Sequence, residues 1–261
     1  MGRFDGKVVL VTGGNRNTGL DIVEKFVREG ATVFMCGSST LSTTSGAEAL
    51  KARGVNGVTS VPCDISDAVQ VKVLFDTIER EAGRLDILVN NAANQGIGHG
   101  GPLEMKPEMF YDVFKTNVVG GFQVTQTACN RFFMKQESRG GVVFLSSNTA
   151  MRAIRNRTAY CSSKGAINSM VRALALDLAP LGIRVNCCAP GYIYTERWAT
   201  LDPEKAARRR LNCPLRKEAK GSDIANVVAF LASDDSANMT GEIVTCDAGC
   251  SCQHIPEDVD V

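Results

Sequence analysis

Short apolar runs rich in β-branched residues alternate along this chain with longer stretches whose apolar residues recur every three or four positions. The short runs have the length and composition of buried strands, and the longer stretches have the period of helices with one buried face. The predicted strands are residues 8–11, 32–35, 58–61, 87–89, 142–145, 184–187 and 243–246. Strands that alternate with helices predict a single α/β domain with a parallel, doubly wound sheet and helices on both faces.

The stretch 147–164 carries the clearest candidate chemistry. Ser147 follows the predicted strand 141–146, at the end where open α/β sheets usually bind ligands. A helix is predicted to open near Arg157, which places Tyr160 and Lys164 on one face, one turn apart. A free tyrosine has a pKa of about 10, and a nearby ammonium group should lower it, so we expect Lys164 to activate Tyr160.

The same helix has a buried stripe that should hold these two side chains on a rigid element. Its apolar residues follow the spacing of one helical face. They are Ile167, Met170, Val171, Leu174 and Leu178.

A second candidate site follows the first predicted strand. Residues 12–19 read TGGNRNTG, and Leu20, Ile22, Val23, Phe26 and Val27 then give a helical apolar face. This is a strand, a glycine-rich turn and a helix in succession. Glycines let the backbone approach a pyrophosphate, and the exposed N–H groups of a helix start favour its negative charge.

Size and charge narrow the classes of function. The chain has 261 residues, a formal net charge of +1 and 22% charged residues. This balance gives no reason to expect nucleic acid or an anionic membrane as a partner, and favours a small-molecule role. No apolar run approaches the roughly 18–20 residues of a membrane helix, and the N-terminus lacks the features of a secretory signal, so we expect a cytoplasmic protein.

The ten cysteines do not predict a disulfide scaffold. A chain of this length does not need one, and four of them lie in or beside predicted strands, where they should be reduced core thiols. These are Cys36, Cys63, Cys187 and Cys246. The only histidines are His99 and His254, and no zinc-ligand spacing is present, so no metal site is expected.

Ser147, Tyr160 and Lys164, with twelve residues between the first two, resemble the active-site signature of the short-chain dehydrogenase/reductase family. The turn at 12–19 resembles that family's Thr-Gly-x-x-x-Gly-x-Gly cofactor loop, and residues 90–93 resemble its Asn-Asn-Ala-Gly motif. Residues 240–241 and 247–249 resemble its closing motif. The resemblance covers about residues 5–249.

Three positions depart from this pattern, because Asn17, Ala93 and Ala248 stand where the family has glycine. Asparagine tolerates left-handed backbone angles better than most residues, so the cofactor turn can survive with Asn17. These departures leave open a non-catalytic dinucleotide sensor as an alternative to an enzyme.

The resemblance implies a Rossmann-type fold with a seven-stranded parallel sheet in the order 3-2-1-4-5-6-7. It implies a catalytic domain over residues 1–249, with a lid at about 195–214 and a tail at 250–261. It also implies a homo-oligomer, most often a tetramer. The helix expected around 118–134 supports this, because its apolar residues occupy more than one face. They are Val118, Phe122, Val124, Phe132 and Phe133.

The resemblance also implies roles for single residues. Ser147 would fix the substrate oxygen, Tyr160 would transfer the proton, Lys164 would lower its pKa and hold the nicotinamide ribose, and Asn117 would position a water for proton relay. Asp64 matches a position that contacts adenine, although it could simply cap the next helix. The implied cofactor contacts are Gly13, Asn15, Arg16, Asn17, Thr18, Gly19, Ser38, Ser39, Asp64, Ile65, Asn91, Ala92, Tyr160, Lys164, Pro190, Gly191, Ile193 and Thr195.

The cofactor is expected to be NADP(H) rather than NAD(H). No carboxylate follows the second predicted strand, where an NAD enzyme would bind the ribose 2′-OH. Gly37 should leave room for a 2′-phosphate, Ser38 and Ser39 can donate hydrogen bonds to it, and Arg16 can supply a positive charge.

The substrate class is less determined. A secondary alcohol or ketone is expected, and Arg152, Arg155, Arg157 and Arg197 suggest an anionic one such as a bile acid, although these arginines could equally be solvated or lie at a subunit interface. The alternative is an acyl-thioester reductase whose carrier protein docks on the run at 208–210, although a solvated helix face would also explain that run.

Overall fold

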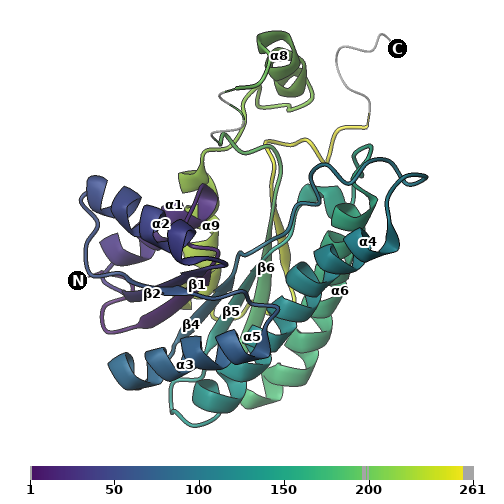
Figure 1. Ribbon diagram of the computed structural model, residues 1–261. Coiled ribbons are helices and arrows are strands. Elements are labelled where there is room, and N and C mark those ends of the chain that lie inside the picture. The colour runs from purple at the N-terminus through teal and green to yellow at the C-terminus, as the bar shows by residue number, and fades with distance from the viewer. Residues whose placement is uncertain (1, 196–197, 199, 255–261) are drawn as a thin grey trace.

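The computed structural model describes residues 2–195, 198 and 200–254, and its centre is a seven-stranded sheet. The strand order is β3-β2-β1-β4-β5-β6-β7, with parallel pairing throughout, which confirms the prediction (Figure 1). Each strand lies within three residues of its predicted ends. The strands are β1 (Val8–Thr12), β2 (Thr32–Gly37), β3 (Thr59–Pro62), β4 (Ile87–Asn90), β5 (Gly141–Leu145), β6 (Arg184–Pro190) and β7 (Ile243–Cys246).

Helices cover both faces of the sheet, as predicted (Figure 1). The α-helices are α1 (Thr18–Arg28), α2 (Thr40–Ala52), α3 (Ala68–Ala82), α4 (Pro107–Phe114), α5 (Gly121–Ala128), α6 (Thr158–Leu178), α8 (Pro203–Leu211) and α9 (Gly221–Ala232). Short 3₁₀ turns are η3 (Asn148–Ala150), η4 (Ala179–Leu181) and η5 (Asp234–Ser236). Within the part of the chain that the structure describes, no helix combines the length and apolar character needed to cross a membrane.

Two apolar cores lie on opposite faces of the sheet, because successive strand residues point to opposite sides. In β1, Leu10 packs with α3, α5 and α6, whereas Val9 and Val11 pack with α1 and α9. The stripe predicted for α6 is confirmed, since Ile167 and Val171 are buried in the first core. The active-site helix is therefore anchored along its length.

One long helical stretch, from 107 to 133, is not regular. It starts with α4, where Pro107 occupies the first turn, and contains two π-helical segments, η1 (Lys115–Gly120) and η2 (Cys129–Phe133). Pro fits a first helical turn because its missing N–H is not needed there. Asn117 lies in η1, and π-helical turns often occur at functional sites.

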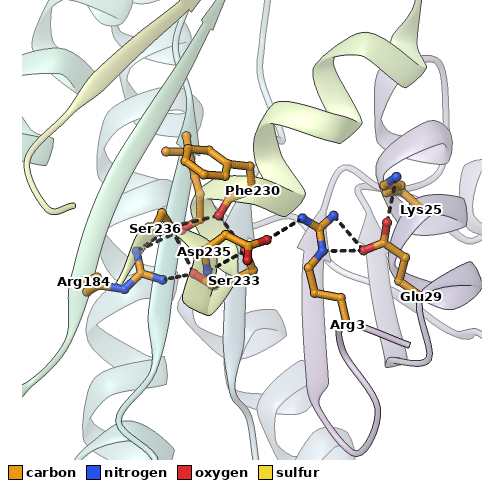
Figure 2. A network of polar contacts seen from close by, with 9 residues as sticks. Arg3, Lys25, Glu29, Arg184, Phe230, Ser233, Asp235 and Ser236 are labelled. Carbon is orange, nitrogen blue, oxygen red and sulfur yellow. Dashed lines mark hydrogen bonds and ion pairs between the residues drawn. The ribbon is translucent and has the colours of Figure 1, made fainter. Parts of the chain in front are cut away.

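A polar network closes the end of the sheet away from the candidate site (Figure 2). Arg3 pairs with Glu29 of the α1 end at 2.8 Å and with Asp235 of η5 at 3.2 Å. Arg184, at the start of β6, donates to the Ser233 carbonyl at 2.9 Å. Arg3, Ser233 and Arg184 line a hollow of about 560 Å³ at the amino ends of the strands. The contacts tie the N-terminus, α9 and β6 into one unit.

The segment predicted as a lid leaves the sheet and returns to it. A parallel bridge joins Ile193 to Ala219, and Tyr194 N–H donates to the Ala219 carbonyl at 2.8 Å. Between these ends the chain carries Trp198 and α8, which stands apart from the helices that flank the sheet (Figure 1). The excursion is thus closed at its base and extends a few residues beyond the predicted 195–214.

The three departures from the family's glycines divide into two conformational classes. Asn17 has φ 46° and ψ −132°, and Ala248 has φ 56°, whereas Ala93 is not among the described residues with positive φ. Only glycine adopts positive φ without a steric penalty. Two of the three replacements therefore store backbone strain.

We expect Asn17→Gly and Ala248→Gly each to raise the free energy of unfolding by about 1 kcal/mol, because they relieve this strain. Ala93→Gly is the control and should lower it by about 0.5–1 kcal/mol, because glycine adds unfolded-state entropy. Urea unfolding measures all three. A change of the same sign in the free energy of unfolding of all three variants would contradict the assignment of strain to Asn17 and Ala248.

Candidate active site

The predicted cofactor residues lie at the carboxyl ends of the strands, around the point between β1 and β4 where the strand order reverses. The turn after β1 packs closely, since a Cβ on Gly13, whose φ is 63°, would lie 2.8 Å from Ala92 Cα. No side chain caps the start of α1 at Asn17. The Gly19 and Leu20 N–H groups donate to the Arg16 and Asn17 carbonyls, each at 3.0 Å, so the feature that favours an anion here is the positive end of the α1 dipole.

Thr12 and Asn91 hold the ends of β1 and β4 together. Asn91 Nδ2 donates to the Thr12 and Gly13 carbonyls at 3.0 and 2.8 Å. The N–H groups of Asn91 and Ala92 both donate to Thr12 Oγ1 at 3.1 Å. Asn91 therefore shapes the glycine turn through its side chain. Thr12 was missed as a site residue, although it immediately precedes the glycines.

The end of β2 differs from the expectation in one respect. The space expected beside Gly37 is filled, because a Cβ there would lie 2.6 Å from the Asn15 side chain. Room for a 2′-phosphate next to Gly37 was therefore a wrong prediction. Ser38, Ser39 and Arg16 are exposed at the same edge, and Ser39 also caps α2 by accepting from the Ser42 N–H at 3.2 Å.

The structure after β3 shows whether Asp64 caps the next helix. Asp64 accepts from the Ser66 N–H and hydroxyl at 2.9 and 2.8 Å, whereas Asp67 caps α3. The idea that Asp64 caps the helix is therefore wrong, because the loop runs three residues further before α3 begins. Ile65 is 4% exposed, because its side chain packs in the core of the domain next to Gly120. Its side chain is therefore largely covered by the protein itself.

Ser147 and Tyr160 meet beyond β5. The Ser147 side chain lies close enough to the Tyr160 phenol to act on its pKa, and Ser147 Oγ accepts from the Thr149 N–H at 3.2 Å. Burial raises the pKa of Tyr160 above its usual value, and the Ser147 side chain acts in the opposite direction. A protonated phenol therefore stands next to a hydroxyl at the edge where the cofactor turn lies.

Lys164 lies one turn along α6 and is buried. Its Nζ donates to the Leu145 carbonyl at 2.7 Å and lies 5.5 Å from the centroid of the Tyr160 ring. Burial lowers the pKa of Lys164 to about 8. The expected lowering of the Tyr160 pKa is not found here, because burial of the phenol outweighs its stabilising contacts and the ammonium is directed at Leu145.

Asn117 acts as a clamp between two segments. Its Oδ1 accepts from the Asn94 N–H at 2.7 Å, and its Nδ2 donates to the Asn94 carbonyl at 2.9 Å and to Ser163 Oγ at 3.0 Å. Ser163 Oγ donates in turn to the Tyr160 carbonyl at 2.7 Å. Asn117 is thus connected to the backbone of Tyr160 through Ser163. Asn94 and Ser163 carry no recognisable sequence signal.

The segment after β6 forms the remaining wall. Ser147 Oγ faces the Pro190 carbonyl at 3.5 Å, and a Cβ on Gly191 would lie 2.5 Å from Asp247 Cβ. Ile193 and Thr195 follow at the base of the excursion, with Ile193 in the bridge to Ala219. Asp247 of the closing motif therefore packs directly against the backbone at Gly191.

The arginines considered for an anionic substrate have different environments. Arg152 is partly buried, Arg155 is exposed, and Arg157 donates to the Gly96 carbonyl at 2.8 Å. Arg197 lies outside the described residues. Arg157 therefore holds the loop after β4.

The basic run at 208–210 does not form a continuous patch. Arg208 is exposed, Arg209 is stacked on aromatic rings, and Arg210 pairs with Glu218 at 2.7 Å.

The parallel sheet, the glycine turn and the hydroxyl–phenol pair define the class of protein, a dinucleotide-binding oxidoreductase. The absence of a side-chain cap at the start of α1 and the close approach at Gly13 fit a nicotinamide dinucleotide. A family model described as Enoyl-(Acyl carrier protein) reductase matches residues 14–251. The chain belongs to the short-chain dehydrogenase/reductase family, whose enzymes act on CH–OH groups with a nicotinamide cofactor.

Individual relatives are similar over nearly the whole chain. L-fucose dehydrogenase of Bos taurus is 34% identical over 244 residues, 89% of this chain and 85% of that protein. The 3-oxoacyl-(acyl-carrier-protein) reductase MabA of Mycobacterium avium is 31% identical over 252 residues, 96% of this chain and 92% of that protein. The crystal structure of gox2181 superposes with a TM-score of 0.87 at 32% identity, covering 95% of this chain and 97% of that chain.

Proposed function

We propose that this enzyme interconverts a secondary alcohol and a ketone with NADP(H), and that Asn117, Ser147, Tyr160 and Lys164 carry the reaction. The observation that supports this most directly is the proximity of the Ser147 and Tyr160 side chains at the carboxyl edge of the sheet, where Ser147 acts to lower the pKa of the phenol. Two neighbouring hydroxyl groups can both donate to one carbonyl oxygen. That arrangement suits proton transfer to or from the oxygen.

In this mechanism Ser147 fixes the substrate oxygen, and Tyr160 donates a proton to it during reduction or accepts one during oxidation. The nicotinamide, when bound, supplies or takes the hydride. Lys164, which donates to the Leu145 carbonyl at 2.7 Å, would hold the nicotinamide ribose. Asn117 keeps the loop at Asn94 and the first turn of α6 in place, and it positions the water of the proton relay.

The preference for NADP(H) rests on the exposed Arg16 and on Ser38 and Ser39, with no carboxylate in the last residues of β2. The phosphate would lie outside the space that Asn15 fills.

We expect Arg16→Ala to weaken NADPH binding about 10–100-fold, because a charge-assisted hydrogen bond is worth about 1.5–3 kcal/mol. NADH binding should change less than about threefold. Fluorescence titration of each reduced cofactor measures both constants, and Arg16→Lys should retain most of the NADPH affinity. Equal weakening of both cofactors would show that Arg16 only supports the turn.

For the substrate we propose an anionic hydroxy compound, such as a hydroxysteroid acid of the bile-acid type. Relatives named as an acyl-carrier-protein reductase and as a sugar dehydrogenase do not select one class. The separate environments of Arg208, Arg209 and Arg210 give a carrier protein no continuous docking patch. A non-catalytic sensor would not need the Ser147–Tyr160 pair.

We also propose a homotetramer in the cytoplasm with residues 195–218 as a lid over the substrate. Val124, Phe132 and Phe133 are buried within the subunit, but Phe122 is 41% exposed and Val119 is 55% exposed. These two side chains support a contact between subunits, which light scattering tests. All ten cysteines are free thiols, which suits a reducing compartment.

The test of the function is a turnover screen with NADPH over ketones from hydroxysteroids, keto acids, sugars and acyl thioesters. Oxidation of NADPH that requires a ketone supports the proposal. Binding of NADPH without turnover of any ketone would favour the sensor.

A further inference from the structure

Arg209 points inward from α8, unlike its neighbour Arg208. Its Cζ lies 5.6 Å from the Tyr192 ring centroid and 5.4 Å from the Trp198 ring centroid. The two rings lie 5.7 Å apart and are inclined at 59°. Stacking on aromatic faces fixes a guanidinium group while leaving its edge N–H donors free to bind an oxyanion.

Arg152 approaches the same place from the loop after β5. Its Nη1 donates to Cys250 Sγ at 3.7 Å, and Cys250 and Cys213 are close enough to act on the pKa of each other. Cys213 Sγ donates to the Arg209 carbonyl at 3.5 Å. The two thiols therefore connect Arg152 of the fixed loop to the backbone of Arg209 on the lid.

Neither arginine is paired with a carboxylate among the described residues, and Asp247, whose charge acts on the same Cys250 thiol as Arg152, is already hydrogen-bonded. Asp247 accepts from Asn148 Nδ2 at 3.1 Å and from the Ser251 N–H at 2.7 Å. The salt bridges found in residues 2–195, 198 and 200–254 include neither Arg152 nor Arg209.

Buried polar atoms without partners occur on the segments that carry this site. Trp198 is 7% exposed, and its Nε1 has no hydrogen-bond partner among the described residues; the same holds for Thr149 Oγ1 and Ser251 Oγ. Buried polar groups are normally satisfied, so an unpartnered cluster indicates a missing acceptor. The Trp198 ring lies 5.4 Å from Arg209 Cζ, so an anionic oxygen at the guanidinium group would be near the Trp198 donor as well.

The cluster adjoins the reacting groups. Tyr192 lies two residues after Pro190, whose carbonyl faces Ser147 Oγ at 3.5 Å. Both arginines act on the Tyr192 phenol electrostatically, although burial raises its pKa overall. A substrate with its alcohol carbon at Ser147 could therefore extend an acid group towards Tyr192.

We propose that Arg152 and Arg209 form a carboxylate-binding subsite that bridges the loop after β5 and the lid. The inference rests on the proposed function, since it names the residues that recognise a hydroxy or keto acid. Arg209 lies on α8 of the proposed lid and Arg152 on the loop after β5, so a carboxylate bound by both would tie the lid to that loop. Arg155 takes no part.

The experiment compares 4-oxopentanoate with its methyl ester, and cholate with methyl cholate. Reduction of the first pair and oxidation of the second give kcat/KM values. Binding is followed separately by the fluorescence of Trp198, the only tryptophan in the chain. Arg152→Ala and Arg209→Ala should each lower kcat/KM for the acids about 10–100-fold and leave the esters within about threefold. Their Trp198 response to the acids should be lost or shifted by the same factor.

Two exposed arginines provide matched controls, Arg208→Ala on the same helix and Arg155→Ala on the same loop. Neither should change the preference for acid over ester. Arg152→Lys and Arg209→Lys keep the positive charge and should retain part of the preference for acid over ester. This outcome separates a loss of binding from a folding defect. Equal acid and ester values in the wild type, or acid binding unchanged in both Ala variants, would overturn the subsite. If Trp198 responds to acids in the wild type but no ketone is reduced, the subsite stands and the proposed function fails.

Discussion

Tyr160→Phe should lower kcat about 10²–10⁴-fold, because general acid–base catalysis contributes about that factor. The substitution removes only the phenolic hydroxyl, so the Kd for NADPH should remain within about twofold of the wild type. Steady-state turnover and NADPH titration measure the two effects. Tyr194→Phe is the matched control, because Tyr194 lies near the same edge but is half exposed.

The raised pKa of Tyr160 gives this prediction a pH dependence with a definite sign. At neutral pH the buried phenol is protonated and is ready to act as an acid. Oxidation of an alcohol needs the phenolate, so its kcat/KM should rise with pH through the alkaline range, whereas reduction should stay level near neutrality. Retention of more than about 5% of kcat in Tyr160→Phe would remove this residue from the proton transfer.

Lys164→Met should make the protein more stable and less active. Burial lowers the pKa of Lys164 from 10.5 to about 8, so below pH 8 the folded protein holds a buried charge at a cost. Between pH 8 and 10.5 the folded state releases this proton before the unfolded state does, and stability rises with pH. Methionine removes the charge, and it also leaves the Leu145 carbonyl without its donor.

The net gain at pH 7 should be about 1–3 kcal/mol in the free energy of unfolding, and it should disappear towards pH 10. Urea unfolding at both pH values measures it, with Lys135→Met as an exposed control. Turnover should fall, and the Kd of the cofactor should rise about 10–100-fold, because the proposed mechanism assigns the nicotinamide ribose to Lys164. A less stable variant at pH 7 would show that the Leu145 contact outweighs the buried charge.

The sequence by itself determined the architecture and the identity of the main candidates. Local apolar patterns located all seven strands and the buried stripe of α6, because residue spacing sets which side chains share a face. The spacing of Tyr160 and Lys164 placed both on one helix face for the same reason. These predictions depend only on neighbours along the chain.

Contacts between distant segments decided the rest. Asn15 fills the space beside Gly37, Asn117 connects Asn94 to Ser163, and Arg209 stacks on rings from the loop after β6 and the start of the lid excursion. No periodicity encodes these pairs, since they are far apart in the chain.

The pKa values of Tyr160 and Lys164 were also decided by the tertiary structure. The sequence predicted that Lys164 would lower the pKa of Tyr160, but both groups are desolvated in the folded protein, and burial disfavours the charged form of each. The number of residues between two ionisable groups sets how closely they can approach. How much water is excluded around them, and where each points, depends on the packing of the entire domain.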